Sequence, residues 1–154
     1  MKRVFLISYL LVVSSMLMVA QAKVIDLRSV PKHVTWVDPS KEVCIKHKGS
    51  FENNICKATW DGAMAICESI GKNLGSFEDY KNMIATCGEE MNHFSDDNKK
   101  AYQTCMQDNN FQIDGYYWTL EEESDESWRW YVSIQKGYNN LFPKNRSITV
   151  RCVE

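Results

Sequence analysis

The spacing of hydrophobic residues changes twice along this chain, and each change predicts a different kind of element. The first residues, Val4–Val19, form an almost unbroken apolar run. From Thr59 to Gln107, apolar residues recur every three or four positions, as on one face of a helix. After Gly115 they alternate with polar residues, as in strands with one buried face. Helices followed by strands predict an α+β domain.

The apolar run at the start predicts an export signal. Lys2 and Arg3 precede it, and the sequence AQA at residues 20–22 is an A-x-A cleavage site. A membrane anchor is the alternative, but the run is short for a span. We therefore expect a signal peptide over residues 1–22 and a single domain over residues 23–154, with no membrane segment after cleavage.

Two helices are predicted from their end signals. Thr59 suits the N-cap of a helix whose end is marked by Gly71. Ser76, with Asp79 three positions later, has the capping-box pattern of a second helix, FEDYKNMIATC at residues 77–87. The first helix is expected to pack its apolar face on the core, a face formed by Ala63, Ile66, Cys67 and Ile70.

A third helix is predicted after Ser95, over residues 96–107. We expect its buried side to carry Ala101, Tyr102 and Cys105. Cys87 ends the second helix and Cys105 lies near the end of the third, so a disulfide between the two helices is the natural pairing.

A hairpin with its own disulfide is predicted near the start of the domain. The segments Glu42–Lys46 and Asn54–Lys57 flank a polar stretch with turn residues, and a Cys44–Cys56 bond would connect the two strands. Val34–Val37 is expected to form a short strand before this hairpin.

The second half of the domain is predicted to form an antiparallel meander of three strands. These are Tyr116–Leu120, Trp128–Ile134 and Ser147–Val153, with a turn and loop around Gly137. In the middle strand we expect one face to be buried, the face of Trp128, Trp130, Val132 and Ile134. The opposite face, with Arg129, Tyr131 and Ser133, is expected to be exposed.

Cysteine usage and charge restrict the class of protein. All six cysteines follow the predicted signal and none forms a C-x-x-C pair, which favours disulfides in an oxidising compartment. The formal charge is −2, or −4 without Lys2 and Arg3, so nucleic acid is not an expected partner. Four basic residues near the C-terminus are expected to form a solvated face: Lys136, Lys144, Arg146 and Arg151.

Metal and catalytic motifs are weakly represented. The acidic run Glu121–Glu126 lacks the spacing of a calcium loop, and a solvated turn is the preferred interpretation. His33, His47 and His93 are scattered, and no H-E-x-x-H, G-x-S-x-G or S-x-x-K pattern occurs. We therefore expect no enzyme activity, no metal and no cofactor.

Four stretches, taken in order, resemble a known family. They are ATWDGAMAIC at residues 58–67, YYWT at 116–119, WRWYVSIQKG at 128–137 and ITVRCVE at 148–154. Together they resemble the Lcl-type C-terminal domain, a secreted bacterial domain with a C-type-lectin-like fold. The resemblance covers most of the predicted domain.

The resemblance implies two or three helices packed on a small twisted antiparallel sheet, with the chain ends close together. In such folds a cysteine of the first helix is bonded to one in the last strand, which pairs Cys67 with Cys152. The chain departs from the family pattern at YYWTLE, where Y-W-S-S-T-E is usual, and in the segment after the first helix. Ligand-binding residues therefore cannot be transferred from the family.

The expected function is that of a secreted, non-enzymatic binding module in the periplasm or at the cell surface. It would recognise a glycan or a protein surface without calcium, and the candidate ligand-binding residues are Arg129, Tyr131 and Tyr138. The alternative is an envelope or surface subunit whose purpose is assembly, including homo-oligomerisation. A small secreted hydrolase is a distant third hypothesis.

Overall fold

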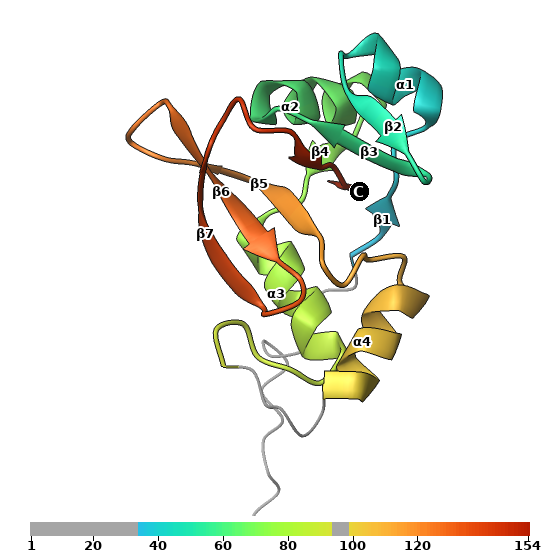
Figure 1. Cartoon of the computed structure of the whole chain (residues 1–154), viewed down its shortest axis with the longest axis vertical. Coiled ribbons are helices and arrows are strands. Elements are labelled where there is room, and N and C mark those ends of the chain that lie inside the picture. The colour runs from blue at the N-terminus through green and yellow to red at the C-terminus, as the bar shows by residue number, and fades with distance from the viewer. Residues whose placement is uncertain (1–33, 94–98) are drawn as a thin grey trace, which may run out of the picture. The chain divides into compact units, whose positions relative to one another are not determined.

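The structure is a computed structural model that describes residues 34–93 and 99–154 (Figure 1). All of these residues belong to one unit of the chain, Pro31–Glu154. The predicted signal peptide, His33 and the expected cap Ser95 lie outside the described residues. Within the described ranges, no helix is both long enough and apolar enough to cross a membrane.

Two of the predicted helices begin and end where the sequence signals place them. In α2 (Trp60–Ser69) the Thr59 hydroxyl accepts a hydrogen bond from the backbone N–H of Gly62, and Gly71 follows with φ of 69°. In α3 (Phe77–Thr86) Ser76 and Asp79 form the predicted capping box. These signals are local, so both predictions are confirmed.

The third predicted helix is present as α4 (Lys99–Asp108), but its buried face differs from the prediction. Tyr102 is buried as expected, whereas Ala101 is exposed and Met106 takes its place in the core. Tyr102 also donates a hydrogen bond of 2.8 Å to the carbonyl of Ile134. This face therefore packs α4 against the end of a distant strand.

The predicted hairpin exists, but one of its strands was assigned wrongly. The segment expected as the first strand is a helix, α1 (Lys41–Lys46), because Ser40 caps it by accepting from the Val43 N–H. The hairpin consists instead of β2 (Ser50–Glu52) and β3 (Ile55–Ala58), joined by Asn53-Asn54 with φ of 51° and 63°. Both turn residues are in the left-handed conformation, which asparagine tolerates.

The strands form two sheets rather than the single antiparallel sheet that was expected. A three-stranded sheet has the order β1 (Trp36–Val37), β9 (Cys152–Val153), β4 (Asn73–Leu74). A six-stranded sheet has the order β2, β3, β8 (Ile148–Thr149), β5 (Tyr116–Glu122), β6 (Trp128–Ser133), β7 (Tyr138–Pro143). The pair β5–β8 is parallel, so this sheet is mixed. The α+β class is confirmed, with four helices among the described residues.

The last predicted strand is divided between the two sheets. Ile148–Thr149 pairs with β3 and β5, and Cys152–Val153 pairs with β1 and β4. Figure 1 shows the C-terminus beside β1. Val150 and Arg151 form the step between the sheets, which places Arg151 where the two sheets meet. The segment after Gly137, expected as a loop, is the edge strand β7.

Both faces are buried in the middle of β5 and along most of β6, which corrects the expected exposure of one face of β6. Trp118 and Tyr131 belong to one hydrophobic cluster, and Tyr117 and Val132 belong to a second. Arg129 and Tyr131 are therefore only 5% and 4% exposed, although they alternate with the predicted core positions. Trp128, expected in the core, is 40% exposed because it lies at the end of the strand, where the covering elements stop.

All three expected disulfides are present. Cys44–Cys56 connects α1 to β3, Cys67–Cys152 connects α2 to β9, and Cys87–Cys105 connects the end of α3 to α4. No described cysteine is free. The three bonds thus fix helices to sheets or to each other, in a domain whose strands are mostly short.

Candidate functional site

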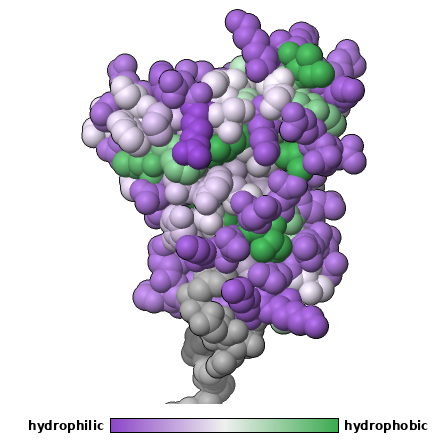
Figure 2. Space-filling view, viewed as in Figure 1, coloured by the Kyte–Doolittle hydropathy of each residue, from purple (hydrophilic) through white to green (hydrophobic). Residues whose placement is uncertain are grey.

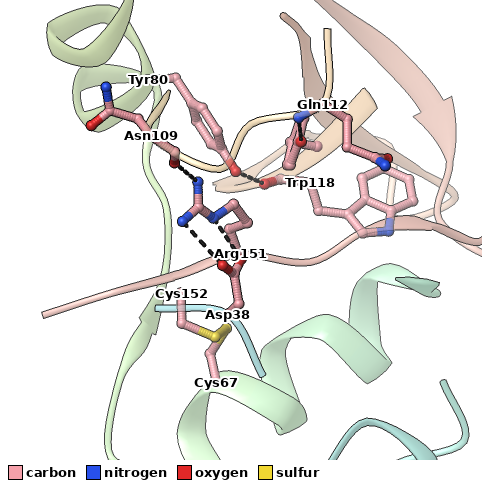
Figure 3. Close-up of polar contacts among 9 residues, drawn as sticks. Asp38, Cys67, Tyr80, Asn109, Gln112, Trp118, Arg151 and Cys152 are labelled. Atoms are coloured by element: carbon pink, nitrogen blue, oxygen red, sulfur yellow. Dashed lines mark hydrogen bonds and ion pairs between the residues drawn. A yellow bond between two sulfur atoms is a disulfide. The ribbon is translucent and has the colours of Figure 1, made fainter. Parts of the chain in front are cut away.

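Arg151 is the most unusual polar residue of the domain because it is charged and only 2% exposed. Its Nη1 donates to the carbonyl of Asn109 at 2.9 Å, and its Nε lies 2.8 Å from Oδ1 of Asp38 (Figure 3). This Nε contact has the distance of an ion pair but not the alignment of a hydrogen bond. The guanidinium also lies over the rings of Phe111 and Trp36, at 4.2 and 5.5 Å.

This arrangement corrects the expectation that Arg151 belongs to a solvated basic face. The step between β8 and β9 turns its side chain inward, where a carboxylate, a carbonyl and two rings compensate its charge. Asp38 is about half exposed, with 48% of its side chain accessible. The ion pair therefore has one buried and one accessible partner.

Two buried tyrosines near Arg151 make separate hydrogen bonds (Figure 3). The hydroxyl oxygen of Tyr117 accepts the backbone N–H of Gln112 at 2.7 Å, and the Tyr80 hydroxyl donates to the carbonyl of Trp118 at 3.3 Å. Burial raises the pKa of Tyr117 to about 12 and the pKa of Tyr80 well above its usual value. Both phenols thus stay protonated at neutral pH.

A cleft of about 530 Å³ opens beside the Asp38–Arg151 pair. Its walls include the rings of Phe51, Phe111 and Tyr117. Five side-chain amides also line it, those of Asn53, Asn54, Gln107, Asn110 and Gln112. Four of these residues are exposed and Gln112 is half-buried, so the amides are accessible from solvent. We call this feature the amide cleft.

The backbone explains some of these amides but not all. Asn53, Asn54 and Asn110 have φ of 51°, 63° and 61°, a conformation that favours asparagine over most residues. Gln107 and Gln112 have no such requirement. Gln107 lies in the last turn of α4, and Gln112 lies in the segment between α4 and β5. At these two positions the local backbone gives no reason for an amide.

The chemistry of the amide cleft is that of a polyhydroxyl site. A side-chain amide presents a donor and an acceptor side by side, which matches a sugar hydroxyl that both donates and accepts. Of the three rings on the lining, Phe51 is half-buried and offers part of a flat apolar face that a sugar ring can cover, whereas Phe111 and Tyr117 are only 2% and 1% exposed. Among residues 34–93 and 99–154, no group of three or more His, Cys, Asp or Glu side chains is placed to hold a metal ion.

The sequence-predicted ligand residues lie elsewhere, on the β6–β7 part of the six-stranded sheet. Arg129 stacks on Trp60 at 4.6 Å and donates to the carbonyls of Asp125 and Trp128. Its expected exposure is wrong, and with 5% of its surface accessible it offers little to a ligand. Tyr131, expected beside it at the surface, is equally buried.

Tyr131 belongs to an aromatic group on β5, β6 and β7. Its ring stacks on Phe142 with the centroids 3.8 Å apart, and Tyr116 and Tyr138 pack at its edges. Burial, followed by the hydrogen bond with Tyr138, raises the pKa of Tyr131 above its usual range. Tyr138 is half-buried, so of the three predicted residues it is the most accessible. The structure does not bring these residues to the amide cleft.

The acidic run Glu121–Glu126 begins in the last two residues of β5 and continues as the predicted turn before β6. Ser124 donates to Glu123 and lowers the pKa of that carboxyl, and Ser127 N–H donates to Asp125. Glu121 is an exception, since its Oε1 accepts the backbone N–H of Phe77 at 2.8 Å and so stabilises the start of α3. One acid of the run therefore has a structural role.

The amide cleft was missed because its residues are far apart in the sequence. Asn53 was assigned to a turn and Asn54 to the start of a strand. Gln107 was the last residue of a predicted helix and residues 108–112 followed it, and Arg151 was assigned to the surface. The one available signal was the density of amides in the QDNNFQ stretch at residues 107–112. Only the fold brings these segments together.

Comparisons of the chain with protein-family models, curated proteins and solved structures find no match. The resemblance to the Lcl-type C-terminal domain therefore stays a prediction. What can be concluded about function rests on the geometry of the amide cleft and on the disulfide-linked α+β fold.

Proposed function

We propose that this protein is an exported, non-enzymatic binding module that recognises a glycan in the amide cleft without calcium. The observation that carries the proposal is the combination of five accessible amides with the half-buried ring of Phe51 around one cleft. Carboxylates are scarce there: Asp38 is the acid on the lining, and Arg151 already compensates its charge. The direct contacts to sugar hydroxyls would thus come from amides.

Several other features support this proposal. On the face shown in Figure 2, hydrophilic residues predominate and hydrophobic ones form small separate groups, which favours a polar ligand. Three disulfides favour an oxidising compartment outside the cytoplasm. The bond from α2 to the last strand, and the pairing of β1 with that strand, are also what a C-type-lectin-like fold requires.

The proposal is tested by a glycan array, run with the purified protein in calcium and again in excess chelator. We expect the same glycans to be bound under both conditions. Glycans whose binding disappears with chelator would overturn the metal-free part of the proposal. An array with no binding, followed by no response to the same sugars in calorimetry, would overturn glycan recognition itself.

The site is tested with substitutions that respect the backbone. Asn110→Gly removes an amide while keeping the left-handed conformation, and Gln112→Ala removes a second one. Each is expected to weaken binding about tenfold, the loss of one or two hydrogen bonds to the ligand. Asn92→Gly is the matched control, because Asn92 has φ of 68° and does not line the cleft. Equal affinities for all three variants would contradict the assignment.

An assembly or interaction subunit is the second candidate function. Tyr116, Leu120 and Trp128 are exposed by 39–40% on the neighbouring strands β5 and β6, which is unusual for large apolar residues. Light scattering coupled to size-exclusion chromatography tests this alternative. A strict monomer across the micromolar range would count against homo-oligomerisation.

A further inference from the structure

The amide cleft does not stand alone, because two smaller hollows adjoin it. A hollow of about 190 Å³ shares Gln112 and Thr149 with the cleft and also includes Lys57, Tyr116 and Arg146. We call it the basic hollow. A hollow of about 340 Å³ shares Asn110 and Arg151 with the cleft, and its other polar residues include Asp79, Asn82, Thr86 and Asp108. We call it the acidic hollow.

The shared residues show that the three spaces adjoin one another. Thr149 is 5% exposed and Arg151 is 2% exposed, so each is a buried polar residue at its junction. Gln112 and Asn110 are the more accessible residues at the same two junctions. A ligand that crosses a junction would therefore pass over a buried polar floor and beside an amide.

The charges at the two ends differ in sign. At one end the exposed Lys57 and Arg146 outnumber the exposed Asp114, and the Arg146 guanidinium lies 4.1 Å from the centre of the Phe142 ring. Asp79 and Asp108 line the other end. A uniformly charged chain would be repelled at one end or the other, whereas an uncharged chain meets no such penalty. The charges thus disfavour a polyanion and favour a neutral ligand.

We propose that the basic hollow, the amide cleft and the acidic hollow form one binding groove for an extended, neutral oligosaccharide of more than one sugar unit. The proposal rests on the glycan recognition proposed above and specifies the length and charge of the ligand. Tyr116 is 39% exposed in the basic hollow and presents a ring on which a sugar unit beyond the central cleft can stack. Asn82 presents an amide in the acidic hollow.

The test is calorimetry with neutral oligosaccharides of one to six units, as oligomers of N-acetylglucosamine, glucose and mannose. For the series that binds, affinity is expected to rise at least about tenfold from the single sugar to the longer chains, the equivalent of one additional good contact. Tyr116→Ala and Asn82→Ala are each expected to remove part of this gain while leaving single-sugar affinity unchanged.

Matched controls are available on the same elements. Leu120→Ala removes another 39%-exposed side chain of β5, and Lys81→Ala removes an exposed neighbour of Asn82 on α3. Neither residue lines a hollow, so both variants should keep the full gain with length. If the rise in affinity with oligosaccharide length were lost in the control variants as well, the loss would be due to a less stable protein, and this result would contradict the groove.

The outcomes separate this inference from the proposed function. Single sugars bound as tightly as hexasaccharides would overturn the extended groove and leave glycan recognition in place. Preference for a polyanionic chain over its neutral counterpart would overturn the charge argument and, with it, the groove as proposed. Binding of extended peptides with no binding of any saccharide would overturn both proposals.

Discussion

The disulfide between Cys67 and Cys152 is expected to contribute more to stability than either of the others. Its two residues are 85 positions apart, against 12 for Cys44–Cys56 and 18 for Cys87–Cys105. Loop-closure entropy scales with the logarithm of this separation, which gives about 4.6, 2.8 and 3.2 kcal/mol respectively at 25 °C. The long bond also connects α2 to β9, so it stabilises contacts between residues that are far apart in sequence.

The measurement is urea unfolding of paired alanine variants, with the free energy of unfolding obtained by linear extrapolation. Cys67→Ala/Cys152→Ala should lose about 2 kcal/mol more than Cys44→Ala/Cys56→Ala. The comparison is matched because all four cysteines are 0–3% exposed, so the cavities left behind are similar. Equal losses, or a larger loss from the Cys44–Cys56 pair, would refute the reasoning from loop length.

Three further predictions concern stability. Asp38→Asn leaves the buried Arg151 guanidinium without its charged partner and should lower the free energy of unfolding in urea by about 1–2 kcal/mol, a value discounted for the half-exposed carboxylate. The control Glu78→Gln breaks the exposed ion pair with Lys81 and should lower that free energy by less than about 0.5 kcal/mol. Gly75→Ala would place a Cβ 2.7 Å from the Trp36 ring and should cost about 1–3 kcal/mol, measured in the same way. Because burial raises the pKa of Tyr117 from 10 to about 12, its contribution is complete below pH 10 and is lost as pH rises from 10 to 12. The alkaline absorbance titration of the folded protein should therefore lack the ionisation of Tyr117 near pH 10, and a Tyr117→Phe variant should show a weaker loss of stability over that range.

The elements that could be predicted from the sequence are those specified by local interactions. The caps of α2 and α3 depend on residues three positions apart, so Thr59, Ser76 and Asp79 suffice to place both helix starts. The pairing of Cys87 with Cys105 followed from two adjacent helices. By contrast, α1 was mistaken for a strand because its six residues are too short for a helical period to be recognised.

The burial of β6 could not be predicted because alternating hydrophobic and polar residues show only that the two faces of a strand differ in polarity. They do not show that the more polar face is exposed to solvent. Tyr131 and Arg129 occupy the less hydrophobic face, and that face is covered by Phe142 and by Trp60. Covering elements come from other parts of the chain, and no local pattern reports them. The predicted ligand surface at Arg129 and Tyr131 was therefore placed where the fold leaves almost no accessible area.

The amide cleft was beyond sequence reasoning for a related cause. Arg151 lies between two sheets, and the alternation of residues 147–153 predicted one continuous strand instead. Without that step, Arg151 has no reason to turn toward Asp38, from which it is separated by 113 positions. The site thus depends on the long-range pairing of β8 with β3 and β5 and of β9 with β1 and β4, which hydrophobic periodicity does not specify.

The central claim is that the amides of the cleft bind sugar hydroxyls without a metal. The most direct measurement is a ¹H–¹⁵N titration that follows side-chain amide signals in excess chelator, with the oligosaccharide series described above as the ligand. The account predicts saturable shifts for Gln107, Asn110 and Gln112 and unchanged signals for the control Asn92. Unchanged cleft amides, or shifts confined to residues around Tyr131 and Tyr138, would contradict it.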